Sequence, residues 1–283
     1  MHRIQGRGHI AAAAALATAI TGGAAATAVA QDDPGIAVPD GLRVSGALGT
    51  EVSSHFISYG TDVWGAGSSW SRPSVFAFSE VSIDFDYFDV TTGVWFDIRE
   101  SDRGPLGGPI NEVDWYLGIG KNIDRFRVDL VYQAWFYTDE GTEEVFDVVL
   151  GFDDSDLLFE GFAFNPSLIA HTRLHGPDPD FTGGTVFVFG IEPEYTVMPD
   201  GDFPVTFSLP AEVAFGIDGF YADNGFGYAA LGVSAGMPLT FIPADYGSWS
   251  LGANLTYYWT DADAIGNPRS DFLTGLVGLY LDF

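Results

Sequence analysis

Hydrophobic and polar residues alternate in short segments along the chain from residue 42 to residue 283. In the last segment, Val277, Leu279 and Leu281 alternate with other residues and lead to Phe283. Successive side chains of a β-strand point to opposite faces, so this alternation predicts strands with one apolar face. Turn residues separate the segments, and the pattern predicts about twelve strands. The predicted strands lie near residues 42–56, 75–85, 90–98, 113–119, 126–136, 144–153, 168–174, 187–195, 205–217, 231–241, 249–259 and 275–283.

The predicted apolar faces share one property, which is that they contain no charged residue. Most of the strand charges lie on the opposite faces, as where Glu80 and Asp84 oppose Val81 and Ile83. A bilayer requires such a charge-free face, because a basic side chain at its midplane costs about 2–4 kcal/mol. The core of a soluble β-sandwich requires it too, so a secreted sandwich is a competing fold class.

The predicted connections alternate in length along the chain. Odd-numbered connections are mostly long or rich in Gly, Pro and Asp, namely residues 58–73, 100–111, 176–182 and 260–271. Most even-numbered connections are short, namely residues 86–89, 121–124, 198–203 and 243–247. Residues 138–142 and 154–161 depart from this pattern, as a short odd connection and a long even one. Transmembrane barrels show the same asymmetry between extracellular loops and periplasmic turns.

Prolines within the strands constrain the prediction, because proline donates no hydrogen bond to a ladder. Pro166, Pro193 and Pro210 are therefore expected at strand ends, bulges or rims. Pro210 falls in the middle of the predicted strand 205–217, which is the strongest local conflict in the assignment. A strand in lipid must pair all of its backbone polar groups, so a lipid-exposed sheet has to close into a barrel.

The first 30 residues have the three parts of a secretory signal peptide. A basic stretch over residues 1–9 precedes a small, apolar stretch over residues 11–26. Ala28-Val29-Ala30 then has the small-x-small form of a cleavage site. We therefore expect residues 1–30 to be removed on export, residues 31–41 to form a short periplasmic leader, and residues 42–283 to form the barrel domain.

Charge and composition narrow the classes of function. The chain has 39 acidic and 11 basic residues, and loss of Arg3 and Arg7 with the signal leaves nine minus thirty-nine, or −30. Such a chain is repelled by nucleic acid, where binding depends on neutralising phosphates. The chain has no cysteine, which excludes a disulfide framework and thiolate chemistry. No apolar run of about 18 residues follows the signal, which excludes helical membrane spans.

The charged residues of the polar faces form the candidate functional site. In a closed barrel they would point inward, where an excess of carboxylates raises the local cation concentration. A plugged lumen, with carboxylates and arginines paired across it, is the alternative, because about twelve strands lie between filled small barrels and open porins. The candidate lumen-lining residues are Arg43, Glu51, Glu80, Asp84, Asp97, Arg99, Asp114, Arg127, Asp129, Asp147, Arg173, Glu192, Glu194, Glu212 and Asp218.

No catalytic, cofactor or metal site is predicted. His55 and His171 lie in predicted strands, but neither matches the His-x-Ser-Asn-like pattern of outer-membrane phospholipases. Acidic clusters such as residues 153–156 match no defined calcium loop and are expected to be solvated turns. The protein is therefore expected to act without enzymatic chemistry.

Several segments resemble the TorF-type porins, which are outer-membrane barrels of Gram-negative bacteria. The resemblance rests on the ending Leu276 to Phe283, the strand pairs between Ser74 and Asp153, the stretch Glu112 to Gly118, and the Glu-x-Phe-Asp segment at Phe146. It implies an outer-membrane barrel and transfers no functional residue. Phe283 also resembles the terminal signature by which such barrels are recognised for assembly.

We therefore predict an all-β, up-and-down antiparallel transmembrane β-barrel in the bacterial outer membrane. The expected function is that of a porin or small-solute channel with an acidic, cation-favouring lumen. The expected partners are outer-membrane lipid, the barrel-assembly machinery through Phe283, and small cationic or neutral solutes. The competing function is that of a non-conducting structural or adhesive barrel that acts through its extracellular loops.

Overall fold

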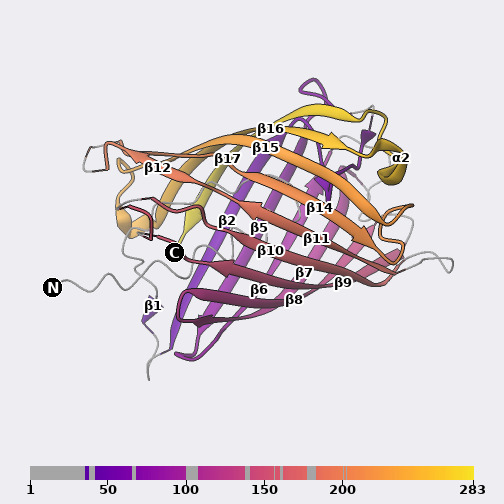
Figure 1. Ribbon diagram of the computed structural model, residues 1–283. Coiled ribbons are helices and arrows are strands. Elements are labelled where there is room, and N and C mark those ends of the chain that lie inside the picture. The colour runs from indigo at the N-terminus through magenta and orange to yellow at the C-terminus, as the bar shows by residue number, and fades with distance from the viewer. Residues whose placement is uncertain are drawn as a thin grey trace.

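The strands of the computed structural model form one closed antiparallel barrel (Figure 1). Each strand pairs with its neighbour in the sequence, and the last strand, β17, pairs with the first long strand, β2. This closure confirms the predicted up-and-down barrel of twelve strands and excludes the two-sheet sandwich. The structure describes residues 36–37, 42–65, 68–99, 108–137, 141–155, 157–159, 162–176, 183–199, 201 and 203–283.

Fourteen segments make up the wall, because two of the twelve barrel strands are interrupted. The segments are β2 (Arg43–Ser53), β5 (Ser74–Asp84), β6 (Asp89–Ile98), β7 (Ile110–Ile123), β8 (Phe126–Tyr137), β9 (Gly141–Phe152), β10 (Ser167–His175), β11 (Gly184–Ile191), β12 (Glu194–Val197), β13 (Val205–Ser208), β14 (Ala211–Ile217), β15 (Gly225–Pro238), β16 (Ser248–Thr260) and β17 (Asp271–Asp282). The remaining described elements are β1 (Ile36–Ala37), β3 (Ile57–Ser58), β4 (Thr61–Asp62), a 3-10 helix at Ala244–Tyr246 and α2 (Ala262–Ile265).

The interruptions explain the conflict at Pro210. The pairs Ser208↔Ser234 and Ala211↔Leu231 keep one register with β15, so β13 and β14 are two parts of one strand. Between them, the Pro210 carbonyl accepts from Gly232 N at 2.7 Å, and Leu209 N donates to the Pro193 carbonyl at 3.0 Å. The proline therefore sits in a short break, where its missing donor interrupts the ladder without shifting its register.

The two faces of the wall differ as the alternation predicts. On β7, Trp115, Leu117 and Ile119 are exposed on the outside, whereas Asp114 and Tyr116 between them are buried on the inside. The same alternation runs along β16, where Leu251, Leu255 and Trp259 face outward. The barrel thus presents an apolar outer surface and a largely polar interior, which is the reverse of a soluble protein's arrangement.

The seam of the barrel joins the two ends of the described wall. β17 pairs with β2 from Leu276↔Ser53 to Asp282↔Ala47. Beyond this ladder, Phe283 and Gly46 exchange two backbone hydrogen bonds, of 2.8 and 3.0 Å. A Cβ on Gly46 would lie 2.6 Å from Cζ of Phe283, so the glycine makes room for the terminal ring. The last residue of the chain is therefore part of the closed ladder.

The connections divide between two ends of the barrel, because neighbouring strands are antiparallel. We call the end that carries the connections β2–β5, β6–β7, β10–β11, β14–β15 and β16–β17 the long-loop end, and the opposite end the short-turn end. At the short-turn end, β7 and β8 are joined by only Asp124 and Arg125. The turn between β9 and β10 is the long exception at that end, as the sequence indicates.

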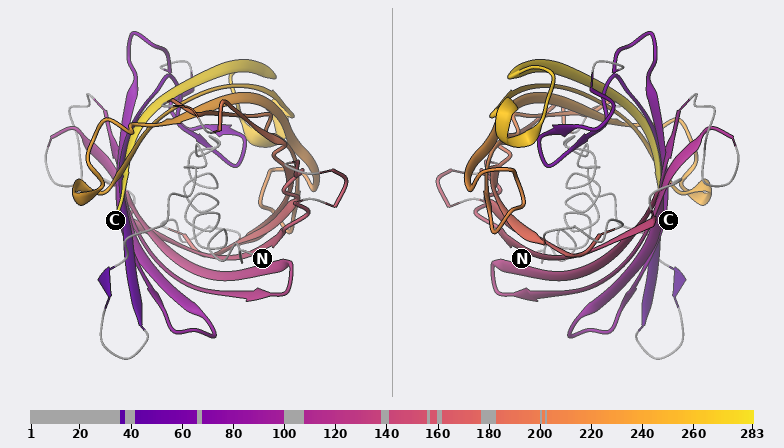
Figure 2. Two further views of the ribbon diagram at one scale, coloured as in Figure 1. Left: turned by 90° about the vertical axis from the view of Figure 1, so that its left-hand side faces the viewer. Right: turned by 90° about the vertical axis from the view of Figure 1, so that its right-hand side faces the viewer.

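The β2–β5 connection differs from its prediction. Phe56 ends the predicted strand 42–56, but β2 ends at Ser53 and Phe56 turns inward, where it is 2% exposed. The following hairpin of β3 and β4 projects inward over part of the barrel opening when the molecule is viewed along its axis (Figure 2). The apolar side chains of this connection therefore pack against other side chains inside the lumen and not against lipid.

Of the residues described, no helix is long and apolar enough to cross a membrane. The predicted signal peptide, residues 1–30, lies outside the described residues. Of the predicted leader, residues 31–41, only β1 is described, and it pairs with Arg43 and Val44 of β2.

Candidate functional site

The inner face of the wall carries many of the charged residues singled out in the sequence. Glu51, Glu80, Asp97, Asp114, Asp129 and Asp147 are buried there. A second group is only partly buried and consists of Asp84, Arg99, Arg127, Arg173, Glu192, Glu194 and Glu212. Two residues lie at the rims: Arg43 is exposed at the first position of β2, and Asp218 is exposed just beyond the end of β14. The interior charge is therefore concentrated on β2 and β5 to β10.

Arg127 forms an ion-pair cluster toward the short-turn end. Its guanidinium donates to both oxygens of Asp89 at 2.8 and 2.9 Å and to both oxygens of Asp129 at 2.6 and 3.1 Å. The three side chains are only 11 to 12% exposed. Gly120 between them lacks a side chain, and a Cβ there would lie 2.0 Å from Nη2 of Arg127. One arginine thus bridges two carboxylates across β6, β7 and β8.

We expect Arg127→Ala to destabilise the barrel by about 3 kcal/mol, because it leaves two carboxylates facing each other without their cation. Urea unfolding in phospholipid vesicles measures the change. Arg43→Ala is the control, because Arg43 is exposed and should change stability by less than about 0.5 kcal/mol. Equal stability of the two variants would show that the cluster is not a structural element of the wall.

Two other carboxylates are held by tyrosines rather than by cations. Tyr116 donates its hydroxyl to Glu80 at 2.8 Å, and Tyr280 donates to Glu51 at 2.9 Å. Both acceptors are buried, at 6% and 3% exposure. A tyrosine hydroxyl positions a carboxyl group without supplying a counter-charge, so neither Glu80 nor Glu51 is held by a cation here.

A group of carboxylates lies nearer the long-loop end, on β6, β7 and β9. The barrel register places Asp97 beside Glu112 and places Asp114 and Glu143 on opposite sides of Trp135. Glu143 lies 2.8 Å from Nε of Arg173, and Asp97 accepts from the Trp64 indole at 3.1 Å. The carboxyls of Asp114 and Glu112 are hydrogen-bond neighbours, and no other donor in the described part of the chain reaches Asp114. Acids outnumber their cationic neighbours here.

Asp147 organises a buried polar chain on the neighbouring strands. One oxygen lies 2.6 Å from Nδ1 of His171, and the other accepts from the amide of Gln133. Gln133 in turn accepts from the indole of Trp135 at 3.1 Å. His171 is fully buried between the rings of Tyr59 and Trp135. This chain fixes the side chains of β8, β9 and β10 and leaves Nε2 of His171 without a hydrogen bond among the described residues.

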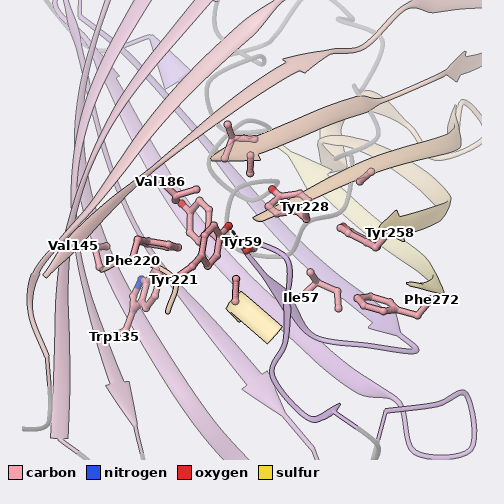
Figure 3. Packing of buried hydrophobic residues seen from close by; sticks show 14 residues of the cluster. Ile57, Tyr59, Trp135, Val145, Val186, Phe220, Tyr221, Tyr228, Tyr258 and Phe272 are labelled. Carbon is pink, nitrogen blue, oxygen red and sulfur yellow. Dashed lines mark hydrogen bonds between the residues drawn. The ribbon is translucent and has the colours of Figure 1, made fainter. Parts of the chain in front are cut away.

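An aromatic cluster fills part of the interior toward the long-loop end (Figure 3). It combines side chains from the wall with side chains from three connections, β2–β5, β14–β15 and β16–β17. Its buried members are Ile57, Tyr59, Trp135, Val145, Val186, Val188, Ala214, Phe220, Tyr221, Tyr228, Ala230, Tyr258, Ala264 and Phe272. The interior is therefore polar along one part of the wall and blocked by rings at another.

The strands opposite these carboxylates carry inward polar side chains of a different kind. In a closed ring of twelve strands, β15 to β17 lie opposite β7 to β9. Their buried inward polar residues are the neutral Ser234, Ser250, Asn254, Thr256, Thr260 and Thr274. Carboxylates on one side thus face hydroxyl and amide groups on the other. Within the described residues, no group of three His, Asp or Glu side chains is arranged to hold a metal ion.

His55 and Asp62 form the charged part of the inward connection. Nε2 of His55 lies 4.0 Å from Oδ2 of Asp62. Burial lowers the pKa of the His55 imidazole, and Asp62 opposes this shift. Burial raises the pKa of the Asp62 carboxyl, against the hydrogen bond from Ser68 and the charge of His55.

Three buried carboxylates of the described wall strands were missed in the sequence: Asp89, Glu112 and Glu143. Glu112 and Asp114 are two residues apart, so the alternation of side chains indicates that both lie on the same face of β7. Glu143 and Asp89 fell just outside the predicted strand limits, because β9 begins at Gly141 and β6 at Asp89. The Tyr59–His171 contact had no local signal, since it joins residues distant in sequence.

No family model matches the chain, and no curated protein matches it. The resemblance to TorF-type porins therefore stays a prediction.

Solved structures of similar shape are distant in sequence. The NanC porin is 13% identical, with a TM-score of 0.41 over 84% of this chain and 98% of that chain. The β-domain of the Bordetella autotransporter BrkA is 11% identical, with a TM-score of 0.43 over 86% and 99%. The outer-membrane channel DcaP of Acinetobacter baumannii is 9% identical, with a TM-score of 0.40 over 88% and 99%. At this level of similarity, the function has to be argued from the chain itself.

Proposed function

We propose that this protein is an outer-membrane channel for small solutes with a preference for cations. The observation that carries the proposal is the excess of inward carboxylates over inward arginines on β2 and β5 to β10. Carboxylates on neighbouring strands add their potentials across a narrow, low-dielectric interior and attract cations. Tyr116 and Tyr280 support this role, because they orient Glu80 and Glu51 without supplying a counter-charge.

The outer surface supports a membrane location. Large apolar side chains are exposed all along the wall, such as Leu117, Leu130, Leu231 and Leu255. In water such a surface would be a strong aggregation site, whereas in lipid it is the required face. Tyr87, Phe126 and Tyr246 add exposed rings at the short-turn end, as expected where the wall meets the headgroup layer.

A structural barrel without conduction is the competing function, and one observation favours it. The aromatic cluster occupies the interior toward the long-loop end, so the barrel in this structure is obstructed there. The ion pairs of Arg127 also fill space within the lumen. Conductance of the purified protein in a planar bilayer separates the two functions, because only a channel conducts.

The proposed orientation places the long-loop end outside the cell, and cysteine labelling tests it. The chain has no cysteine, so single substitutions give a clean background. Asp263→Cys lies at an exposed position of the long-loop end, and Tyr87→Cys at a site 80% exposed at the short-turn end. We expect an impermeant thiol reagent to label Asp263→Cys in whole cells, and Tyr87→Cys only after the outer membrane is broken. The opposite pattern would invert the topology.

A further inference from the structure

We infer that residues 54–65 form a strap that closes the lumen at the long-loop end and opens the channel when it leaves its seat. This inference rests on the proposed channel function, and it assigns the opening and closing of the channel to one segment. The strap follows β2 directly and contains the hairpin of β3 and β4. In the axial views its hairpin projects from the wall into one side of the barrel opening (Figure 2). Its contacts explain both why it lies there and how it could move.

The strap is built around a tight two-residue turn. Ile57 pairs with Asp62 and Ser58 with Thr61, which leaves Tyr59 and Gly60 as the turn. Both have positive φ, of 46° and 84°, as a type I′ hairpin requires. This conformation is unfavourable for tyrosine and persists only where surrounding contacts hold it. The turn therefore places the Tyr59 ring at the tip of the strap, and the positive φ of Tyr59 makes this conformation unfavourable by itself.

Aromatic contacts hold the strap at two separate places on the barrel wall. Tyr59 stacks on His171 of β10, with ring centroids 3.9 Å apart. Near the start of the strap, Phe56 packs on Phe76 of β5 and Trp95 of β6 at 5.4 and 5.2 Å. In the closed ring, β6 and β10 are separated by β7, β8 and β9. A segment anchored at both must cross the interior rather than follow one strand.

Polar contacts hold the strap to two other connections. Asn267 donates to the Gly60 carbonyl at 2.7 Å and accepts from Asp62 N at 2.8 Å. Tyr221 donates its hydroxyl to the Tyr59 carbonyl at 2.8 Å. Trp64 joins the strap to the lumen carboxylates through its hydrogen bond to Asp97. These bonds satisfy the strap's backbone at the tip, where its own ladder has only two residue pairs.

The nature of these contacts allows the strap to leave without unfolding the wall. Ser54, at the root of the strap, donates to the Gly275 carbonyl of β17 at 2.9 Å, and none of the described wall ladders includes a residue of 55–65. The seat consists of hydrogen bonds and ring contacts, each contributing about 1 kcal/mol, and of the buried side chains of Phe56, Ile57 and Tyr59, each contributing about 1.5–3 kcal/mol. The Tyr59 backbone would also be relieved of its positive φ on release. The barrel and the strap can therefore change state separately.

A reversible cross-link tests the inference on the full-length protein in planar bilayers. Asp62→Cys combined with Asn267→Cys places two thiols where Asp62 N and Asn267 Oδ1 are 2.8 Å apart, in a chain without other cysteines. Oxidation locks the strap to its seat, and dithiothreitol releases it. If the open state holds about 10% of the population, oxidation should abolish nearly all conductance, and dithiothreitol should restore it to the level before oxidation. Mass spectrometry confirms that the bond has formed.

A loosening variant gives the complementary result. Gly60→Ala places a Cβ 2.4 Å from Cδ1 of Tyr228 at positive φ, so it should push the strap off its seat and raise conductance. Gly108→Ala is the control, because Gly108 also has positive φ but has no atom within 4 Å of its added Cβ. Heat-modifiable gel mobility checks that both variants remain folded barrels.

The outcomes distinguish the strap from the channel. Equal conductance of the locked and released double-cysteine protein would overturn the strap and leave the channel standing. To test the channel itself, residues 57–62 are replaced by two glycines, and this deletion variant has no Tyr59 in the lumen. A folded barrel of this kind that still does not conduct would overturn the proposed channel. Conduction that appears on release and is blocked by locking supports both.

Discussion

Leu130→Arg is expected to prevent stable insertion of the barrel into lipid. Leu130 lies on the outer face of β8, between the inward residues Asp129 and Val131, and is 45% exposed. A basic side chain at the bilayer midplane costs about 2–4 kcal/mol, which is a large part of the stability of a single domain. Urea titration in phospholipid vesicles, read by heat-modifiable mobility, measures the loss.

Phe126→Arg is the matched control for this prediction. Phe126 is on the same strand and the same face, but at the short-turn rim, where the same substitution should cost only about 0–1 kcal/mol. A large loss at position 130 and a small one at position 126 would support a lipid-facing wall. Equal losses at both positions would contradict it, because position in the bilayer would then have no effect.

Neutralising three lumen carboxylates together is expected to remove most of the cation preference. The triple variant Asp97→Asn, Asp114→Asn and Asp129→Asn removes buried inward charge from β6, β7 and β8 while keeping side-chain size. We expect the cation-over-anion permeability ratio to fall about threefold or more at low salt, where screening is weakest. Reversal potentials of single channels measure this ratio.

The control variant changes the same number of charges elsewhere. Asp223→Asn, Asp245→Asn and Asp263→Asn neutralise three exposed acids in the connections. Because these residues are in contact with bulk solvent, their potentials are screened within about 10 Å at 0.1 M salt. If the control lowered the ratio as much as the lumen variant, the preference would arise from net charge rather than from the lumen.

The wall of this barrel was predictable from the sequence, because alternation reports locally which side of a strand is buried. Trp115, Leu117 and Ile119 face outward and Asp114 inward, as their parity indicates. The interruption at Pro210 was also signalled locally, by the missing donor of proline. Both features depend on residues within a few positions of each other, which a sequence shows directly.

The contents of the lumen were not predictable in the same way. Phe56 continues the apolar parity of its strand, yet it turns inward because Phe76 and Trp95 provide an aromatic seat there. The Tyr59–His171 stack joins residues that no local pattern connects. The turn itself was hidden, because Tyr59-Gly60 lacks the Asn or Asp that usually marks a type I′ hairpin. Long-range contacts such as these depend on closure of the barrel, which brings distant strands together.

The sign of the reversal potential under a salt gradient decides whether the lumen prefers cations. Purified wild-type protein is inserted into a planar bilayer with KCl at a higher concentration on one side. The excess of inward carboxylates predicts a potential of the sign that marks cation preference, and a larger one when both solutions are diluted. An anion-selective potential would contradict the account, as would absence of conductance both in the wild type and in the barrel without its strap.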